Sequence, residues 1–155
     1  MAKKTTPEKL GKDIEQILQK RIKGRVQQVK KAVQLGAMEV RNTAILDISR
    51  GSKTGKTYEK YNPRRTHVAS RGGEAPATDT GFLVSQITTE VKVQGQTVIG
   101  QIISSAPYSK YLEFGHINRD GSFTEERPFM QPALMKNREK IKKIFIREGV
   151  IKKWV

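Results

Sequence analysis

The chain contains no cysteine, an absence that excludes disulfide bonds, thiolate catalysis, zinc fingers and iron–sulfur clusters. Aromatic residues make up 6% of the chain and hydrophobic residues 35%, a composition near the border between globular and disordered proteins. No segment approaches the ~18 apolar residues of a membrane span, and no apolar signal segment follows Met1–Lys4. We therefore expect a soluble, unprocessed protein that assembles inside the cell and contacts no membrane.

Negative charge is also scarce, since 15 acidic residues stand against 30 basic ones in 155 residues, the length of a single domain. The positive excess lies in residues 1–48, 49–71 and 136–155, whereas residues 72–126 hold seven acidic and three basic side chains. Two functions fit this asymmetry: phosphate binding, or contact between copies of the chain in which a basic flank meets the acidic centre. Solvated lysine-rich helix faces are the alternative to both.

One long amphipathic helix is predicted over residues 7–47. Apolar residues recur there at intervals of three and four, which places them on one helical stripe. They are Leu10, Ile14, Leu18, Ile22, Val26, Val29, Val33, Ala37, Val40 and Ala44. Thr6 and Pro7 provide a helix start. A straight helix of this length would measure ~60 Å, more than one globule of this size can cover. The helix therefore either bends or breaks at Gly24 or Gly36, or packs part of its stripe on another subunit.

A long basic loop is predicted over residues 49–77, because six glycines or prolines interrupt this segment and no helical stripe runs through it. Within it, Lys56–Tyr61 and Thr66–Ser70 could form a loose hairpin. Basic side chains alternate here with Tyr58 and Tyr61, a composition suited to phosphate contacts and base stacking without sequence recognition. The candidate contacts with DNA or with a neighbouring subunit are Arg50, Lys53, Lys56, Lys60, Arg64, Arg65 and Arg71.

Shorter elements are predicted in the acidic centre. Residues 80–87 form a short helix capped by Asp79 or Thr80. Residues 88–105 contain two β-rich runs that alternate apolar and polar side chains on either side of Gly95. They predict an antiparallel hairpin whose turn lies near that glycine.

Pro107 begins a second short helix, residues 107–114, and a polar loop of residues 116–126 follows it. The last helix is predicted over residues 128–148, where apolar residues again follow helical spacing, and residues 149–155 form a tail. This order of elements predicts an α+β fold: a long N-terminal helix and a C-terminal helix packed on a small antiparallel β-sheet, in a single domain with a long basic loop.

The residues show no catalytic or metal-binding pattern. Gly51–Thr57 is similar to a phosphate-binding loop, but Arg50 stands where that loop requires glycine, and Pro63 interrupts the helix that must follow. His67 and His116 lack a second ligand at metal spacing. The carboxylates Glu113, Asp120, Glu125 and Glu126 are interpreted as interface charges. We therefore expect no enzyme activity, no cofactor and no metal.

Three motifs are more informative together than singly. They are Ala75–Leu83 (APATDTGFL), Ala106–Gly115 (APYSKYLEFG) and Arg127–Leu134 (RPFMQPAL). In this order, after a long N-terminal helix, they resemble the neck and tail-completion proteins of long-tailed bacteriophages, the family that joins tail to head. The likeness covers about residues 70–145.

The resemblance implies a non-enzymatic virion protein that forms a homo-oligomeric ring, commonly sixfold. Its neighbours would be the head connector or stopper on one side and the tail tube or tail terminator on the other. The protein would occupy the host cytoplasm during assembly and the neck or tail of the virion afterwards, with non-specific contact to passing DNA. A non-specific basic nucleic-acid-binding protein is the alternative function.

The same motifs have structural roles that follow from their residue types. Asp79-Thr80-Gly81 reverses the chain, and Tyr108 and Tyr111 anchor the short helix on the sheet. Arg127 is expected to pair with Glu113, and Phe129 to be buried against Tyr108, Tyr111 or Phe114. The candidate structural residues are Asp79, Thr80, Gly81, Tyr108, Tyr111, Glu113, Phe114, Gly115, Arg127, Pro128 and Phe129.

Overall fold

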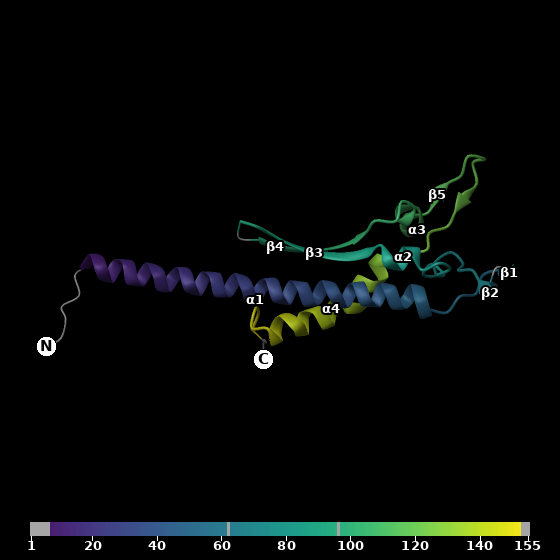
Figure 1. Cartoon of the computed structure of the whole chain (residues 1–155). Coiled ribbons are helices and arrows are strands. Elements are labelled where there is room, and N and C mark those ends of the chain that lie inside the picture. Colours follow the sequence, from purple (N-terminus) through teal and green to yellow (C-terminus); the bar gives the residue numbers. More distant parts are fainter. Residues whose placement is uncertain (1–6, 62, 96, 153–155) are drawn as a thin grey trace.

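A computed structural model describes residues 7–61, 63–95 and 97–152 and confirms the predicted α+β fold (Figure 1). The first helix, α1 (Pro7–Arg50), has 44 residues and is therefore ~66 Å long. It is continuous through Gly24 and Gly36, so the first of the two alternatives, a bend or break, does not occur, and packing on another subunit stays a prediction. Gly36 instead faces the last helix, α4 (Met130–Arg147), where an added Cβ would lie 3.5 Å from the Ile141 side chain.

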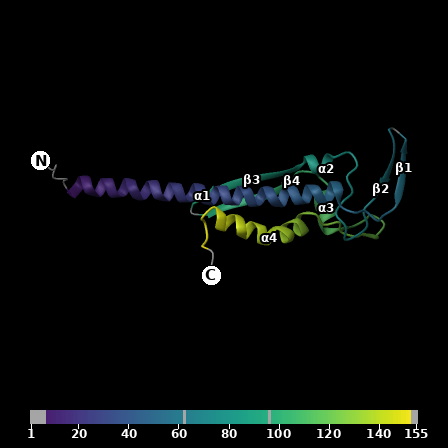
Figure 2. The same cartoon turned by 90° about the horizontal axis from the view of Figure 1, so that it is seen from below.

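The C-terminal half of α1 lies between α4 and a β-hairpin (Figures 1 and 2). The hairpin consists of β3 (Ile87–Gln94) and β4 (Thr97–Ser104), which pair antiparallel along their whole length. Gly95 has a φ of 59° in the turn, and no described residue other than glycine has a positive φ. Gln94 beside the turn therefore has no positive φ, and Gln96 lies outside the described residues.

Small residues bring α1 close to its neighbours. An added Cβ at Gly100 of β4 would lie 2.6 Å from Val33 Cγ1 of α1, so only glycine fits this crossing without a shift. Ala32, Ala37 and Ala44 are buried along the same half of the helix. The short side chains let α1 serve both the hairpin and α4, because backbone elements approach more closely where side chains are small.

The main core lies at the C-terminal end of α1. It joins residues of α1, the short helix α2 (Phe82–Ser85), β3, α4 and the connections between them: Val40, Ala44, Ile48, Leu83, Ile87, Ala106, Phe129 and Ala133. Phe129 is 1% exposed, whereas Tyr108, Tyr111 and Phe114 are 41, 46 and 75% exposed. Phe129 is thus buried as expected, and it packs in a cluster whose other members are aliphatic.

Polar contacts supplement the apolar packing of α1 on α4. Three ion pairs cross between these helices or their ends, Lys31–Glu148, Asp47–Lys136 and Glu39–Lys140. The buried Asn137 amide donates to Thr43 Oγ1 at 2.7 Å and to the Ala133 carbonyl at 2.8 Å. Because a buried amide without partners would cost stability, these bonds favour one register of the two helices.

The remaining elements surround the C-terminal end of α1 in Figure 1. They are β1 (Thr57–Tyr61), β2 (Arg64–Val68), α2 (Phe82–Ser85), α3 (Ser109–Phe114), β5 (His116–Ile117) and β6 (Phe123–Thr124). The strands form three separate two-stranded antiparallel sheets, β1–β2, β3–β4 and β5–β6, where the sequence predicted one small sheet. The expected polar loop 116–126 therefore contains a hairpin, and the expected loose hairpin in 49–77 is a regular one from Thr57–Val68 to Tyr61–Arg64. None of the helices in the described ranges is long and apolar enough to cross a membrane.

Candidate functional site

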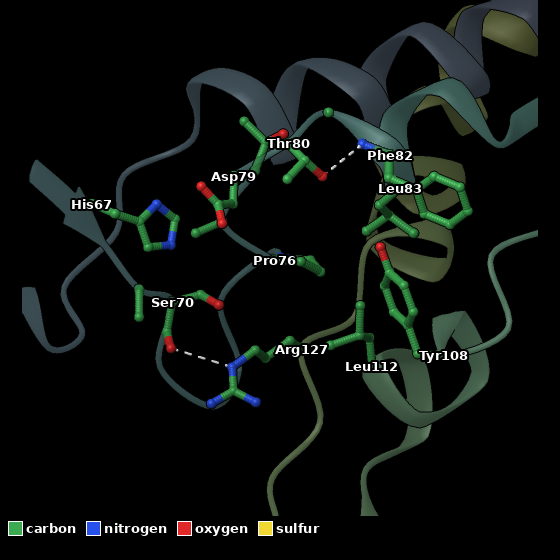
Figure 3. A pocket seen from close by; sticks show the side chains of 14 residues that line it. His67, Ser70, Pro76, Asp79, Thr80, Phe82, Leu83, Tyr108, Leu112 and Arg127 are labelled. Carbon is green, nitrogen blue, oxygen red and sulfur yellow. Dashed lines mark hydrogen bonds between the residues drawn. The ribbon is translucent and has the colours of Figure 1, made fainter. Parts of the chain in front are cut away.

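The first motif forms a corner that ties the β1–β2 hairpin, which we call the basic hairpin, to the core (Figure 3). The Asp79 carboxylate pairs with Lys60 of β1 and, at 2.6 Å, with Arg65 of β2. The hydrogen bond from Lys60, together with the charges of Lys60, Arg65 and His67, lowers the pKa of Asp79 below its usual range. Asp79 is therefore ionised and holds both strands in place.

The expected cap of α2 by Asp79 is wrong. Gly81 occupies the N-cap position with a φ of 79°, a left-handed conformation that glycine adopts at little cost, and no side chain caps the helix. Thr80 Oγ1 lies 3.4 Å from the Phe82 N–H, a long contact (Figure 3). Asp79 serves the hairpin because Lys60 and Arg65 compete for its carboxylate.

A pocket of about 300 Å³ lies beside this corner, between β2, α2 and α3. In Figure 3 the Arg127 side chain extends toward Ser70, with Pro76 above it and Leu112 and Tyr108 on the far side. Arg127 Nε donates to the Ser70 carbonyl at 3.2 Å, so the expected pair of Arg127 with Glu113 is wrong. Arg127 thereby joins the start of the third motif to the end of the basic segment.

Glu113 has a different role, because its carboxylate caps α4. It accepts backbone N–H bonds from Phe129 at 2.9 Å, Met130 at 3.1 Å and Gln131 at 2.9 Å. The local N-cap residue of α4, Phe129, supplies no side-chain cap of its own. A carboxylate at a helix N-terminus satisfies unpaired N–H groups and meets the positive end of the helix dipole. The second and third motifs are therefore joined directly, 16 residues apart.

The tyrosines of the second motif pack on neighbours other than the predicted sheet. The Tyr108 ring lies 6.2 Å from the Phe82 ring of α2, and the Tyr111 ring lies 5.3 Å from the His116 ring of β5. Gly115 follows, with a φ of 68°, and an added Cβ there would lie 2.7 Å from the Thr124 carbonyl. Only glycine allows the chain to turn from α3 into β5 at this distance from β6. Pro128 is half-buried just before α4.

The structure divides the seven basic candidates into three bonded within the chain, one near an aromatic ring and three that are exposed without an ion pair to a described residue. Lys60 and Arg65 pair with Asp79, and Lys53 donates to the carbonyls of Asp47 at 3.0 Å and Ala75 at 2.7 Å. Burial lowers the pKa of Lys53, and the negative charges of Glu74 and Asp47 partly offset this lowering. The Lys56 ammonium lies 5.6 Å from the centre of the Tyr58 ring. The remaining three, Arg50, Arg64 and Arg71, are exposed and form no ion pair with a described residue.

The histidines lie apart from one another in the fold. His67 lines the pocket near Asp79, while His116 packs on Tyr111, and its Nδ1 is buried without a hydrogen bond to any described residue. No group of three or more His, Asp or Glu within residues 7–61, 63–95 and 97–152 could hold a metal ion. Two polar groups of the pocket already have partners, since Asp79 pairs with Lys60 and Arg65, and Arg127 donates to the Ser70 carbonyl, as in a structural joint.

Exposed apolar side chains form two further surfaces, of which the sequence pattern anticipated the first, as a stripe that packs on another subunit, but not the second. One is the N-terminal part of α1, where Ile14, Ile17, Leu18 and Ile22 are about half exposed. The other is the β5–β6 hairpin, where Ile117 is 74% and Phe123 59% exposed. A signal for the hairpin was present, because an Asp-Gly pair between two apolar residues is typical of a tight turn between strands.

No curated protein and no solved structure matches the chain. The family described as "Bacteriophage HK97-gp10, putative tail-component" matches residues 2–115, well over half of the chain. The match includes α1, the β1–β2 and β3–β4 hairpins and the first two motifs. It begins far earlier than the expected likeness over residues 70–145 and ends before the third motif. On this match, the chain belongs to the HK97-gp10-like family of bacteriophage tail components.

Proposed function

We propose that the protein is a structural, non-enzymatic tail-completion component that joins the phage tail to the head. Its copies form a ring, commonly sixfold in the proteins it resembles, between the head connector and the tail tube. The observation that carries this proposal is the uncovered apolar surface at the two ends of an elongated chain. Apolar patches rimmed by charge mark protein contacts, and rigid subunits with such patches suit an assembly whose function is surface complementarity.

Electron microscopy of a phage mutant that lacks this protein tests the proposal. We expect DNA-filled heads and complete tails that are not joined, and we expect a tagged copy to appear as a ring at the neck in averaged images of virions. Joined particles in the mutant would contradict the proposal. Loss of the tail tube itself would also contradict it, since the protein would then act in tube assembly.

We further infer that the basic segment, residues 49–77 with Arg50 and Arg71 at or near its ends, contacts passing DNA weakly and without sequence recognition. Arg50, Arg64 and Arg71 are exposed, and Tyr61 is 79% exposed, so several copies around a conduit would add their fields. Three other candidates are held within the chain, which limits the charge available to phosphate. Such contacts should be screened by salt, because exposed charges interact little beyond a Debye length.

Charge reversal at Arg64 and Arg71 tests this contact. Arg65 is unsuitable, because a glutamate there would face Asp79 and disturb the corner. The Arg64→Glu, Arg71→Glu variant should fold normally but lower the yield of infectious particles. The matched control Arg138→Glu, Lys142→Glu makes the same charge change on exposed positions of α4. Equal yields of infectious particles from both variants would contradict a role for the charge of the basic segment.

A salt titration separates this function from the alternative, a nucleic-acid-binding protein. Tight binding of short duplex DNA, weakening steeply from roughly 50 to 200 mM salt, would favour the alternative. Weak binding throughout, with neck-located protein in virions, supports the tail-completion role.

A further inference from the structure

The N-terminal part of α1 extends beyond the rest of the molecule (Figures 1 and 2). We call residues 7–24 the arm, a helical segment ~27 Å long. Every side chain from Gly11 to Gly24 is exposed, and Arg25, which donates to the Gly149 carbonyl at 2.8 Å, marks where the body begins. No element of the described chain covers the arm, so its apolar side chains face solvent in a single copy.

The arm combines an apolar face with positive charge. Ile14, Ile17, Leu18 and Ile22 are 49, 53, 52 and 57% exposed, and their spacing places them on one side of the helix. The last part of the arm, with its junction to the body, is basic: residues 16–25 contain four basic side chains and no acidic one. Lys20, Arg21 and Lys23 form no ion pair with a described residue.

The β5–β6 hairpin has the complementary properties. Ile117 and Phe123 are direct cross-strand partners, so their side chains lie on the same face. Phe114, at the end of α3, is 75% exposed, and a Cβ added at the adjacent Gly115 would touch the Phe123 ring at 2.8 Å. The segment thus presents two large apolar side chains on a two-stranded sheet and a third, Phe114, on the helix just before it. A two-stranded sheet is marginal in stability when nothing packs on it.

Acidic residues lie close to this apolar face in the sequence. Residues 114–126 contain Asp120, Glu125 and Glu126 against the single base Arg119. Asp120 accepts from the Ser122 hydroxyl at 2.6 Å and the Ser122 N–H at 2.9 Å, and these bonds lower its pKa. The hairpin is therefore apolar and acidic, where the arm is apolar and basic.

From these two surfaces we propose that the arm of one copy docks on the β5–β6 hairpin of the next copy. The two surfaces lie at opposite ends of the molecule, so the arm of one copy cannot reach the β5–β6 hairpin of the same copy (Figure 1). Their contact is heterologous, head to tail, and it closes into a ring when the rotation between copies allows. The inference rests on the proposed function in one respect only, namely that copies of the chain form a ring.

An arm-to-arm dimer fits the charges less well. Two arms would bring basic side chains of residues 16–25 together, whereas the arm and the hairpin bring opposite charges together around apolar centres. In the proposed contact, the basic N-terminal flank of one copy therefore binds the acidic central segment of another copy.

Cysteine cross-linking in assembled particles tests the contact. The native chain has no cysteine, so an introduced pair gives disulfides only at the chosen positions. The Ile17→Cys, Phe123→Cys variant should give, on mild oxidation of purified virions, a ladder of covalent oligomers that extends to the closed ring. The control Ile17→Cys, Tyr61→Cys places the second cysteine on the β1–β2 hairpin, also exposed and at the same end of the molecule, and should give no ladder.

The result that would overturn the proposal is equally defined. Disulfide-linked dimers from the single variant Ile17→Cys, with no larger oligomers from the test pair, would show that the arm binds another arm. A ladder from the control pair but not from the test pair would place the arm on the other hairpin.

Charge exchange provides a second test, in which normal melting curves establish that each variant folds. Lys20→Glu with Lys23→Glu should abolish the cross-linked ladder, and so should Glu125→Lys with Glu126→Lys. Combining the four changes should restore it, because the charges are then exchanged across the contact. Failure of the combination to restore the ladder would contradict the proposed pairing.

The free chains offer a third measurement that needs no virion. An arm variant mixed with a hairpin variant should give one-to-one heterodimers and nothing larger, since only one intact contact remains. Heterodimers formed by a protein that is absent from the neck would support the contact and contradict the tail-completion role. A ring at the neck without cross-links between arm and hairpin would support the tail-completion role and contradict the contact.

Discussion

Phe129 is the largest of the fully buried side chains, and it joins α1, α2, β3 and α4 in one cluster. Glu113 lies next to it and completes the first turn of α4 from another part of the chain. Both residues belong to motifs by which the family resemblance was recognised. Their roles are structural, because one fills the core and the other satisfies backbone donors.

Replacement of Phe129 with alanine should lower the free energy of unfolding by about 3–5 kcal/mol, since it leaves a cavity among close-packed aliphatic groups. The control Phe114→Ala removes the same side chain from an exposed position and should change it by less than about 0.5 kcal/mol. Urea denaturation of the free chain measures both. Equal losses from the two variants would mean that Phe129 lies outside the core.

Replacement of Glu113 with glutamine should cost about 1–2 kcal/mol, because an amide has one acceptor oxygen and no charge for the three N–H groups at the start of α4. Glu126→Gln, at an exposed position nearby, is the matched control. Chemical denaturation gives the difference in free energy, and amide exchange at Met130 and Gln131 localises it. Unchanged exchange at these amides would refute the cap.

Among the elements, the hairpin β1–β2 is attached to the body by charge more than by packing. Asp79 holds both strands, and Glu74 fastens the segments on either side of them. The Glu74 carboxylate accepts bonds from the Thr54 hydroxyl, the Arg71 N–H and the Thr54 N–H, which lower its pKa from 4.5 to about 2. The basic hairpin is thus ordered by acidic residues within its own chain.

The attachment of this hairpin should depend on pH. A carboxyl whose pKa is lowered by folding contributes stability above its unfolded pKa and loses it as the pH falls through the folded value. For Glu74 the loss should occur between pH 4.5 and about 2. An NMR titration should show the Glu74 carboxyl and the Thr54 and Arg71 amides changing together near the lower value. Thr54→Val, which removes the hydroxyl donor, should move this midpoint upward, and an unmoved midpoint would contradict the assignment.

The whole molecule is elongated because α1 is much longer than the body that packs on it (Figure 2). Its C-terminal half is buried between β3–β4 and α4, whereas residues 11–24 of the arm are exposed. A helix without tertiary packing is only marginally stable, even when a stable segment continues it. The two halves of α1 should therefore differ in stability.

Hydrogen exchange on the free chain should reveal this difference. We expect amides of residues 11–24 to exchange within the fast, fraying range and those of residues 36–48 to be protected up to global unfolding. In assembled particles the arm should become protected as well. Uniform protection of α1 in the free monomer would contradict the view that the arm waits for a partner.

Much of the fold could be predicted from local patterns. The stripe of α1, the alternation about Gly95 and the stripe of α4 identified the long helices and the β3–β4 hairpin, because these elements depend on neighbours a few residues away. The partners of the site residues could not be predicted in the same way. Asp79, Glu113 and Arg127 each bond to groups at least 14 residues distant in the chain, where several alternatives have compatible chemistry.

The sequence by itself determined that the chain is basic, free of cysteine, α+β in fold and similar to phage tail components. Only the tertiary structure decided which part of the α1 stripe is buried. The body is too short to cover a helix of ~66 Å, and α4 ends near Arg25, so the apolar residues beyond that point remain exposed. Periodicity shows that a helix has an apolar face, whereas what covers that face depends on the distance its neighbours can reach.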